Sequence, residues 1–155
     1  MSNSKALCVY AAASAGGHLS QLLKLADSWA RYDIVYVTTT EVVQDKLSRF
    51  GRIYVVGECN RQHPFRFIRV FCRCVKVIAR KHPDVVISTG AAVGCIMCCL
   101  GKIVGAKVVW IDSITNVDKL SLSGRIVRYI ADLFIVQWPE LAERYKNVEF
   151  VGEII

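Results

Sequence analysis

The chain has 155 residues, of which 54% are apolar and 21% charged, and a formal net charge of +7. This length and apolar content predict one folded domain with a sizeable core and exclude a disordered chain. Residues 1–5 are polar and the apolar run that follows is too short for a secretory signal, so the seven cysteines are expected to be reduced thiols of a cytoplasmic protein.

Short apolar runs alternate with longer helical patterns along the whole chain. The runs predict strands at residues 6–12, 34–38, 52–56, 84–88, 107–111 and 133–136, with a further candidate at 148–151. The patterns between them predict helices at 19–30, 41–50, 65–81, 91–104, 124–131 and 140–145. Strict alternation of this kind predicts an α/β fold, a Rossmann-like, doubly wound and mostly parallel sheet. Ligands of such sheets lie at the carboxyl ends of the strands, where the strand order reverses.

The first predicted strand runs into a glycine turn and then a helix. The turn reads Ser14-Ala15-Gly16-Gly17-His18. Adjacent glycines let the backbone approach a ligand closely, and the first amides of the next helix favour a phosphate or another anion. His18 at the mouth of the turn can carry a proton near neutral pH. A tight turn that binds nothing explains the loop equally well.

The next informative segment, residues 85–101, contains no charged residue over 17 positions. Ser88-Thr89-Gly90 interrupts it, which favours a buried strand, a turn and an apolar helix over a membrane span. Partial membrane insertion is the alternative. Cys95 and Cys98 form a C-x-x-C pattern inside this apolar run, where small buried hydrophobes are a better interpretation than a zinc or redox site. We therefore expect no metal and no cofactor.

Positive charge is concentrated in residues 46–83. This segment holds ten Lys or Arg and one acid, Glu58, a net charge of +9, whereas the rest has ten basic and twelve acidic residues, a net charge of −2. Its basic residues recur every three or four positions beside apolar ones, a pattern typical of a helix lying on an anionic membrane. The residues assigned to the membrane are Arg66, Phe67, Arg69, Phe71, Arg73, Lys76 and Arg80.

Two alternatives to the membrane interpretation remain. In the first, the arginines simply face water. In the second, the helix binds nucleic acid, although the segment has no aromatic stacking platform and no known nucleic-acid motif. His63 and His82 stand beside prolines at the boundaries of this helix and are interpreted as structural.

The second half carries a set of distinctive motifs. They are Trp110-Ile111-Asp112-Ser113, Leu120-Ser121-Leu122-Ser123-Gly124-Arg125, Gln137-Trp138-Pro139 and Phe150-Val151-Gly152-Glu153-Ile154-Ile155. Together with the glycine turn and Ser88-Thr89-Gly90-Ala91, they resemble one family over nearly the whole chain. That family is the Alg-fourteen-like, PssD/CpsF-type subunit of two-part glycosyltransferases. The glycine turn alone is also similar to the start of MurG-type enzymes.

The resemblance implies a single domain, residues 1–155, equivalent to the amino-terminal half of a GT-B glycosyltransferase. It implies a membrane-associated subunit, peripheral on the cytoplasmic face, that binds a polyprenyl-diphosphate-linked acceptor while a separate catalytic subunit binds the UDP-sugar. His18 would be the catalytic base or a phosphate ligand. The acceptor residues would be Ser14, Gly16, Gly17, His18, Thr89, Gly90, Asp112, Asn116, Ser121 and Ser123. Trp138, Val151, Gly152, Ile154 and Ile155 would dock the partner.

The match has departures, and two other functions stay open. Relatives often have Glu-Ser and an arginine where this chain has Asp112-Ser113 and Asn116, so a bidentate phosphate ligand is missing. For Ser121 and Ser123, capping of the helix at Gly124 is an equally good interpretation. A self-contained nucleotide-binding Rossmann enzyme is disfavoured, because the loop lacks G-x-G-x-x-G and no acid follows the second strand. A non-catalytic membrane anchor for the partner enzyme is the third hypothesis.

Overall fold

The computed structural model describes residues 6–43, 47–59, 64–152 and 154. Its strands are β1 (Cys8–Ala12), β2 (Asp33–Thr38), β3 (Arg52–Val55), β4 (Val85–Ser88), β5 (Lys107–Ile111), β6 (Leu133–Val136) and β7 (Glu149–Phe150). Its helices are α1 (Gly17–Lys24), α3 (Pro64–Arg80), α4 (Ala91–Ile103), α5 (Leu122–Val127) and α6 (Pro139–Arg144), with 3-10 turns η1 (Ala26–Trp29) and η2 (Glu41–Val43).

Most predicted elements are confirmed to within a few residues. The helix predicted for 19–30 is instead α1 followed by the 3-10 turn η1, since α1 ends at Lys24. The helix predicted for 41–50 begins as η2, and its centre at 44–46 lies outside the described residues. The predicted α3 is one helix, with a proline at its first position where a missing amide costs nothing.

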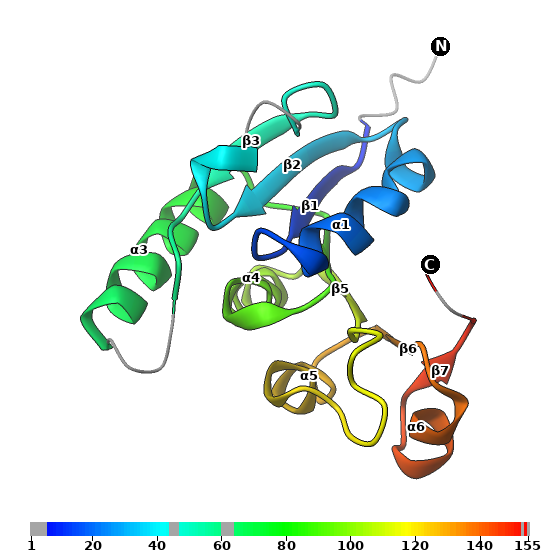
Figure 1. Ribbon diagram of the computed structural model, residues 1–155. Coiled ribbons are helices and arrows are strands. Elements are labelled where there is room, and N and C mark those ends of the chain that lie inside the picture. Colours follow the sequence, from blue (N-terminus) through cyan, green and yellow to red (C-terminus); the bar gives the residue numbers. More distant parts are fainter. Residues whose placement is uncertain (1–5, 44–46, 60–63, 153, 155) are drawn as a thin grey trace.

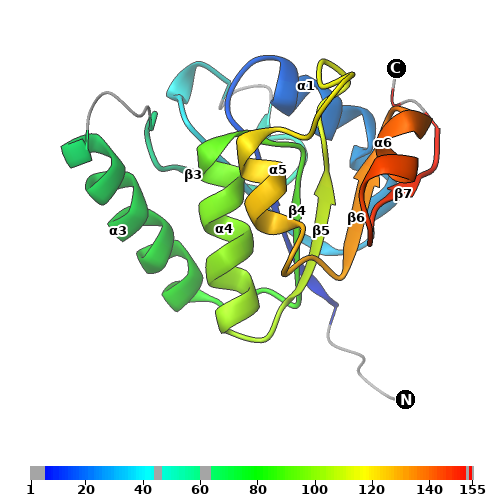
Figure 2. The same ribbon diagram turned by 90° about the horizontal axis from the view of Figure 1, so that it is seen from below.

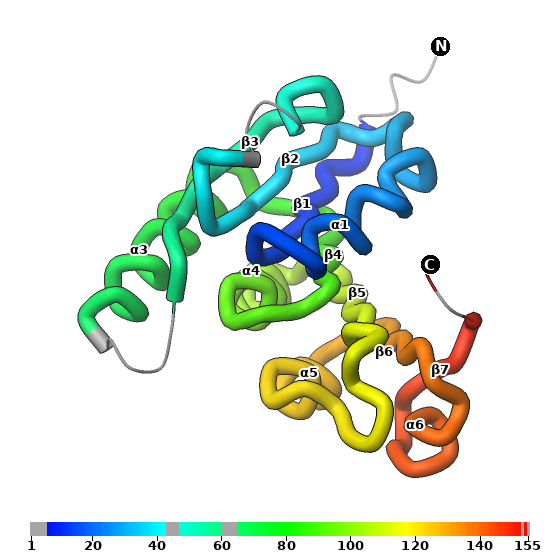
Figure 3. The backbone as a smooth tube through the Cα atoms, viewed as in Figure 1, coloured from blue at the N-terminus to red at the C-terminus, as the bar shows by residue number. Residues whose placement is uncertain are grey.

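The strands form one sheet in the order β3-β2-β1-β4-β5-β6-β7, and every neighbouring pair is parallel. The backbone runs from β1 outward to β3, then returns across to β4 and continues to β7 (Figure 3). The order therefore reverses between β1 and β4. The predicted Rossmann-like, doubly wound fold is confirmed, and its switch point lies where the glycine turn ends β1.

Helices cover both faces of the sheet. α3, α4 and α5 lie side by side on one face, and α1 lies on the other (Figures 1 and 2). Tyr10, Val86 and Trp110 belong to the larger core beneath α3, α4 and α5, whereas Val9, Ala11 and the α1 residue Leu22 belong to the smaller core. Both faces of β1 are fully buried, as expected for a central parallel strand. Within the described residues, no helix is both long and apolar enough to cross a bilayer.

Candidate functional site

The glycine turn after β1 leaves open space above its backbone. Gly16 has φ +101°, a left-handed conformation that favours glycine, and a Cβ added at Gly16 or Gly17 would meet no atom within 4 Å. Thr39 Oγ1 holds the turn by accepting a hydrogen bond of 3.1 Å from the Ala15 amide. Gly16 is the N-cap of α1 and has no side chain to accept from the first amides of the helix. These amides are therefore available to an anion.

The turn after β4 interlocks with the glycine turn. His18 Nδ1 lies 2.9 Å from the Thr89 carbonyl oxygen, and Thr89 Oγ1 donates a bond of 2.7 Å to the His18 carbonyl. Thr89 is completely buried. A carbonyl oxygen only accepts hydrogen bonds, so the neutral ring carries its proton on Nδ1. Nε2 then has a free lone pair and is the atom that can accept a proton.

Gly90 is required by this contact. Its φ is +137°, and a Cβ there would lie 2.5 Å from His18 Cε1. The Gly90 amide donates to Ser88 Oγ at 3.1 Å, and Ala91 follows with φ +67°. A non-glycine residue in this region is strained, a feature that clusters at functional sites. Two turns 71 residues apart in sequence thus form one continuous surface at the switch point.

Asp112, at the carboxyl end of β5, organises a second cluster. It is buried, and Oδ1 accepts from Trp110 Nε1 at 3.1 Å and from Ser121 Oγ at 2.7 Å. Oδ2 accepts from Asn116 Nδ2 and from the Ser121 amide, both at 3.1 Å. Four donors occupy this carboxylate, so its visible role is to hold the loop of residues 113–121 in place. Ser121 also caps α5, because its Oγ accepts from the Gly124 amide at 2.8 Å.

The Gln137-Trp138-Pro139 motif ties the same loop to the end of the chain. The buried Gln137 amide donates to the Asp112 carbonyl at 2.9 Å and accepts from the Ile154 amide at 2.9 Å. Trp138 Nε1 donates to the Ile114 carbonyl at 2.7 Å. Of the residues assigned to partner docking, Val151 is 63% exposed, and Ile155 lies outside the described residues. The structure therefore separates a glycine-turn cluster around His18 from a loop cluster around Asp112.

The exposed surface of helix α3 has a basic side and an apolar side. The basic side lies toward β3: Arg73 donates to the Val56 carbonyl at 3.2 Å, and Arg80 lies over the Tyr54 ring at 5.5 Å. The apolar side, with Phe67 and Phe71 stacked 6.5 Å apart, lies toward α4. Both sides are exposed, as the membrane interpretation requires.

An apolar groove runs between α3, α4 and α5. Its volume is about 770 Å³, and it is lined by Cys59, Phe67, Ile68, Phe71, Ala92, Cys95, Ile96, Cys99, Leu122, Ser123 and Ile126. Of the residues assigned to the acceptor, Ser123 lies here. This groove was not predicted from the sequence, although the pairs Phe67–Phe71 and Leu122–Ile126 at a spacing of four were a signal for it.

Residues 26–154 match the family described as "Oligosaccharide biosynthesis protein Alg14 like". The chain belongs to this Alg14-like family. The UDP-N-acetylglucosamine transferase subunit ALG14 of Mus musculus is 33% identical over 125 residues, which are 76% of this chain and 57% of the relative. The subunit of the same description from Yarrowia lipolytica is 28% identical over 137 residues, 83% of this chain and 63% of the relative. The chain thus spans less than two thirds of either relative.

Solved structures place the Alg14-like chain among GT-B-type folds. MurG of Acinetobacter baumannii superposes with a TM-score of 0.76 at 14% identity, over 93% of this chain and 45% of MurG. A UDP-GlcNAc 2-epimerase of Methanocaldococcus jannaschii gives 0.70 at 12% identity, over 95% and 46%. The likeness shows the fold alone, and this fold corresponds to just under half of each larger chain.

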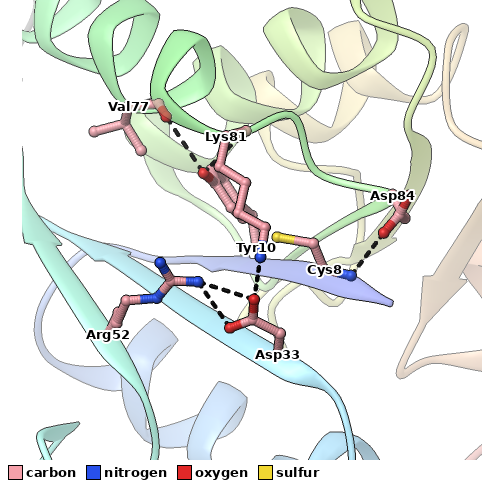
Figure 4. A network of polar contacts seen from close by, with 7 residues as sticks. All are labelled: Cys8, Tyr10, Asp33, Arg52, Val77, Lys81 and Asp84. Carbon is pink, nitrogen blue, oxygen red and sulfur yellow. Dashed lines mark hydrogen bonds and ion pairs between the residues drawn. The ribbon is translucent and has the colours of Figure 1, made fainter. Parts of the chain in front are cut away.

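The opposite edge of the Alg14-like sheet carries a polar network that was not predicted from the sequence (Figure 4). Asp33 at the start of β2 pairs with Arg52 at 2.8 Å and with Lys81. Hydrogen bonds from Lys81 and Arg52 lower the pKa of Asp33. Tyr10 donates to the Lys81 carbonyl at 2.7 Å and the Cys8 amide donates to Asp84 at 2.7 Å. This network fixes the carboxyl end of α3 on the sheet and lies away from the His18 cluster.

The cysteines of the C-x-x-C pattern differ in surroundings. Cys98 is buried, and burial raises the pKa of its thiol. Cys95 lines the groove with Cys99, and a hydrogen bond between the two raises the pKa of Cys95 and lowers that of Cys99 to about 7. All described cysteines are free thiols.

Proposed function

We propose that this chain is the membrane-associated, acceptor-binding subunit of a two-component glycosyltransferase. The pair would transfer a sugar from a UDP-sugar to a polyprenyl-diphosphate-linked saccharide, in the synthesis of a lipid-linked oligosaccharide, a capsule or an exopolysaccharide. The observation that carries this proposal is the interlocked contact of His18 with Thr89 and Gly90 at the switch point. The ALG14 relatives are described as UDP-N-acetylglucosamine transferase subunits, so we propose UDP-N-acetylglucosamine as the donor.

The glycine turn would bind the diphosphate of the acceptor. The α1 amides that follow Gly16 carry partial positive charge and have no cap side chain in front of them. The open space above Gly16 and Gly17 lets phosphate oxygens reach these amides. Asp112 would act indirectly, because its four hydrogen bonds position Asn116 and Ser121 at the rim of the same edge.

His18 would act as the general base. Nε2 would take the proton of the acceptor hydroxyl while the hydroxyl oxygen forms a bond to the anomeric carbon of the donor. The bond from that carbon to the phosphate oxygen breaks, and UDP leaves with the bonding electrons. The Thr89 carbonyl holds Nδ1–H and stabilises the imidazolium that forms. Base catalysis of this kind contributes roughly 10²–10⁴-fold to a rate.

A second chain would provide the donor site. The side chains of Val109, Leu133 and Ile135 alternate with core residues of β5 and β6, so they face the α1 side of the sheet, where they are only half-buried. Parallel sheets normally have both faces covered. Val151 and Phe150 are exposed beside this region. These apolar surfaces support docking of a catalytic UDP-sugar-binding subunit, with α3 on the cytoplasmic face of the membrane.

The test is transfer by the chain purified with its partner, using UDP-N-acetylglucosamine and a polyprenyl-diphosphate acceptor. We expect His18→Ala to reduce turnover at least ~10-fold in a protein that remains folded. His82→Ala, at an exposed histidine outside the site, is the matched control and should retain full turnover. Near-normal turnover of His18→Ala would exclude His18 as the general base. Full activity after changing Gly16, Gly17 and His18 would favour an anchor that only recruits the enzyme, and tight NAD binding by the chain alone would favour a Rossmann oxidoreductase.

A further inference from the structure

The groove between α3, α4 and α5 is a concave part of the surface with an uncharged, mostly apolar lining. Among the described residues that line it, none carries a charge, and most are apolar. Ile68 is 56% exposed, and Leu122 and Ile126 are 50% and 51% exposed. Its volume of about 770 Å³ lies within the ~300–1,000 Å³ of typical small-ligand sites. A concave, mostly apolar surface of this volume is typical of a ligand site.

The groove begins next to the proposed acceptor site. Gly90, whose Cα faces the His18 ring, is the N-cap of α4, and Ala92 in the first turn of α4 lines the groove. Leu122 and Ser123 line it from the first turn of α5, directly after the cap Ser121. α4 and α5 both start at the carboxyl edge of the sheet, beside the start of α1 (Figure 2), so the lining residues of their first turns lie at the edge that carries the glycine turn.

Charge favours a lipid with an anionic end over a second copy of this chain. Arg66, Arg69 and Lys76 lie on the same helix as the groove residues, but on the side of α3 that faces β3 rather than α4. Two copies packed groove to groove would bring two of these basic helices together, which is repulsive. A hydrocarbon chain matches the uncharged lining, and a diphosphate at its end would lie at the uncapped α1 amides of the glycine turn.

We propose that this groove holds the isoprenoid tail of the acceptor, starting from a diphosphate bound at the glycine turn. The inference rests on the proposed function and deepens it, because it assigns the tail a binding site on the protein. The exposed residues of α3 that do not line the groove, such as Phe65 and Val75, remain available to the bilayer. Tail recognition and membrane attachment are thus separate surfaces of one helix.

Native cysteines report on the groove. Cys59, Cys95 and Cys99 line it, whereas Cys72 is exposed on α3 outside it. The full chain would be treated with a maleimide in membrane-free buffer, once in the presence of geranylgeranyl diphosphate and once in the presence of isopentenyl diphosphate. Mass spectrometry would follow the alkylation of each cysteine. At a ligand concentration about ten times Kd, the longer ligand should slow alkylation of Cys99 about ten-fold and leave Cys72 unchanged. Isopentenyl diphosphate should bind but give no protection.

Two variants test whether the hydrocarbon tail binds in the groove. Ile126→Asp places a charge in the groove at an exposed position, and Ile103→Asp places the same charge at a position of α4 that is 80% exposed and outside the groove. Ile126→Asp should raise Kd for geranylgeranyl diphosphate about ten-fold or more, since a buried carboxylate is costly. It should leave Kd for isopentenyl diphosphate unchanged, and Ile103→Asp should change neither value.

The outcomes separate this inference from the proposed function. Equal affinity for the two prenyl diphosphates, without protection of Cys99, would overturn the tail site while leaving diphosphate binding in place. Absence of binding by both ligands would overturn the acceptor role and the tail site together. Protection of Cys99 and Cys72 alike by anionic vesicles that contain no prenyl lipid, with none from the prenyl diphosphate, would make the groove a membrane contact. Protection by the partner chain alone would make it a protein interface.

Discussion

A methyl group added at Gly90 would lie 2.5 Å from Cε1 of His18, so only a hydrogen atom fits between the two turns. The Gly90 φ of +137° disfavours any side chain for a second, independent reason. Gly90→Ala should therefore displace the His18 ring, destabilise the fold by about 1–3 kcal/mol and reduce transfer about 10²-fold. Urea unfolding and the two-component transfer assay measure the two effects.

The matched substitution for stability is Gly17→Ala. Gly17 is the first residue of α1, and a Cβ there meets no atom within 4 Å. Alanine is favoured over glycine in a helix by up to about 1 kcal/mol, so this variant should unfold at the same or a higher urea concentration. Equal destabilisation by both substitutions would show that the contact with His18 does not constrain Gly90.

Asp112→Asn tests the loop cluster. Each carboxylate oxygen of Asp112 now accepts two hydrogen bonds. The NH2 group of an asparagine would replace one of these oxygens, so its N–H donors would face two other donors in a buried site. The expected loss is about 1–3 kcal/mol of unfolding free energy, together with faster amide hydrogen exchange in residues 113–121. Asp118→Asn, at an exposed position of the same loop, should change neither measurement. Unchanged exchange in the Asp112 variant would mean that other contacts hold the loop.

Ionisation of Asp33 should make the free energy of unfolding depend on pH in the acid range. Its pKa in the folded protein is lowered by hydrogen bonds from Lys81 and Arg52. The resulting stabilisation is fully present above the unfolded carboxyl pKa of about 3.9 and is lost as the pH falls through the lower folded value. Because the side chain is 33% exposed, the contribution should be about 1 kcal/mol or less. Asp33→Asn should flatten the fall in unfolding free energy below pH 4, about the unfolded pKa, whereas the exposed Asp27→Asn should not.

The basic side of α3 should govern attachment to anionic membranes. Arg69 and Lys76 are exposed on it, and each basic residue near an anionic surface contributes about 1 kcal/mol. The double variant Arg69→Gln/Lys76→Gln should weaken binding to phosphatidylserine vesicles about 30-fold, and added salt should reduce the difference. Lys24→Gln/Arg31→Gln removes the same charge from the α1 side of the sheet. Equal losses in both variants would mean that net charge alone, and not α3, drives binding.

Much of the fold was predictable because its signals are local. Alternating apolar runs and helical periods specify the strands and helices, and strict alternation specifies a mostly parallel sheet. The position of the switch point, between β1 and β4, came only from the observed strand order. The basic spacing on α3 needed nothing beyond helical geometry. Part of the site was predictable on the same grounds, since Gly16, Gly17 and His18 follow one strand directly.

The rest depended on contacts between distant segments. Pairing of β1 with β4 brings Thr89 and Gly90 to His18, and no local pattern reveals that His18 fits against a residue without a side chain. The four donors around Asp112 and the Tyr10–Asp33–Lys81 network come from segments that meet only after the sheet has assembled.

By itself the sequence determined the order and type of the elements, because hydrophobic period and turn chemistry act over a few residues. Only the tertiary structure decided the proton position on His18, the fixed loop around Asp112 and the groove between α3, α4 and α5. These features depend on strand register and helix packing, which set distances between side chains that are far apart along the chain.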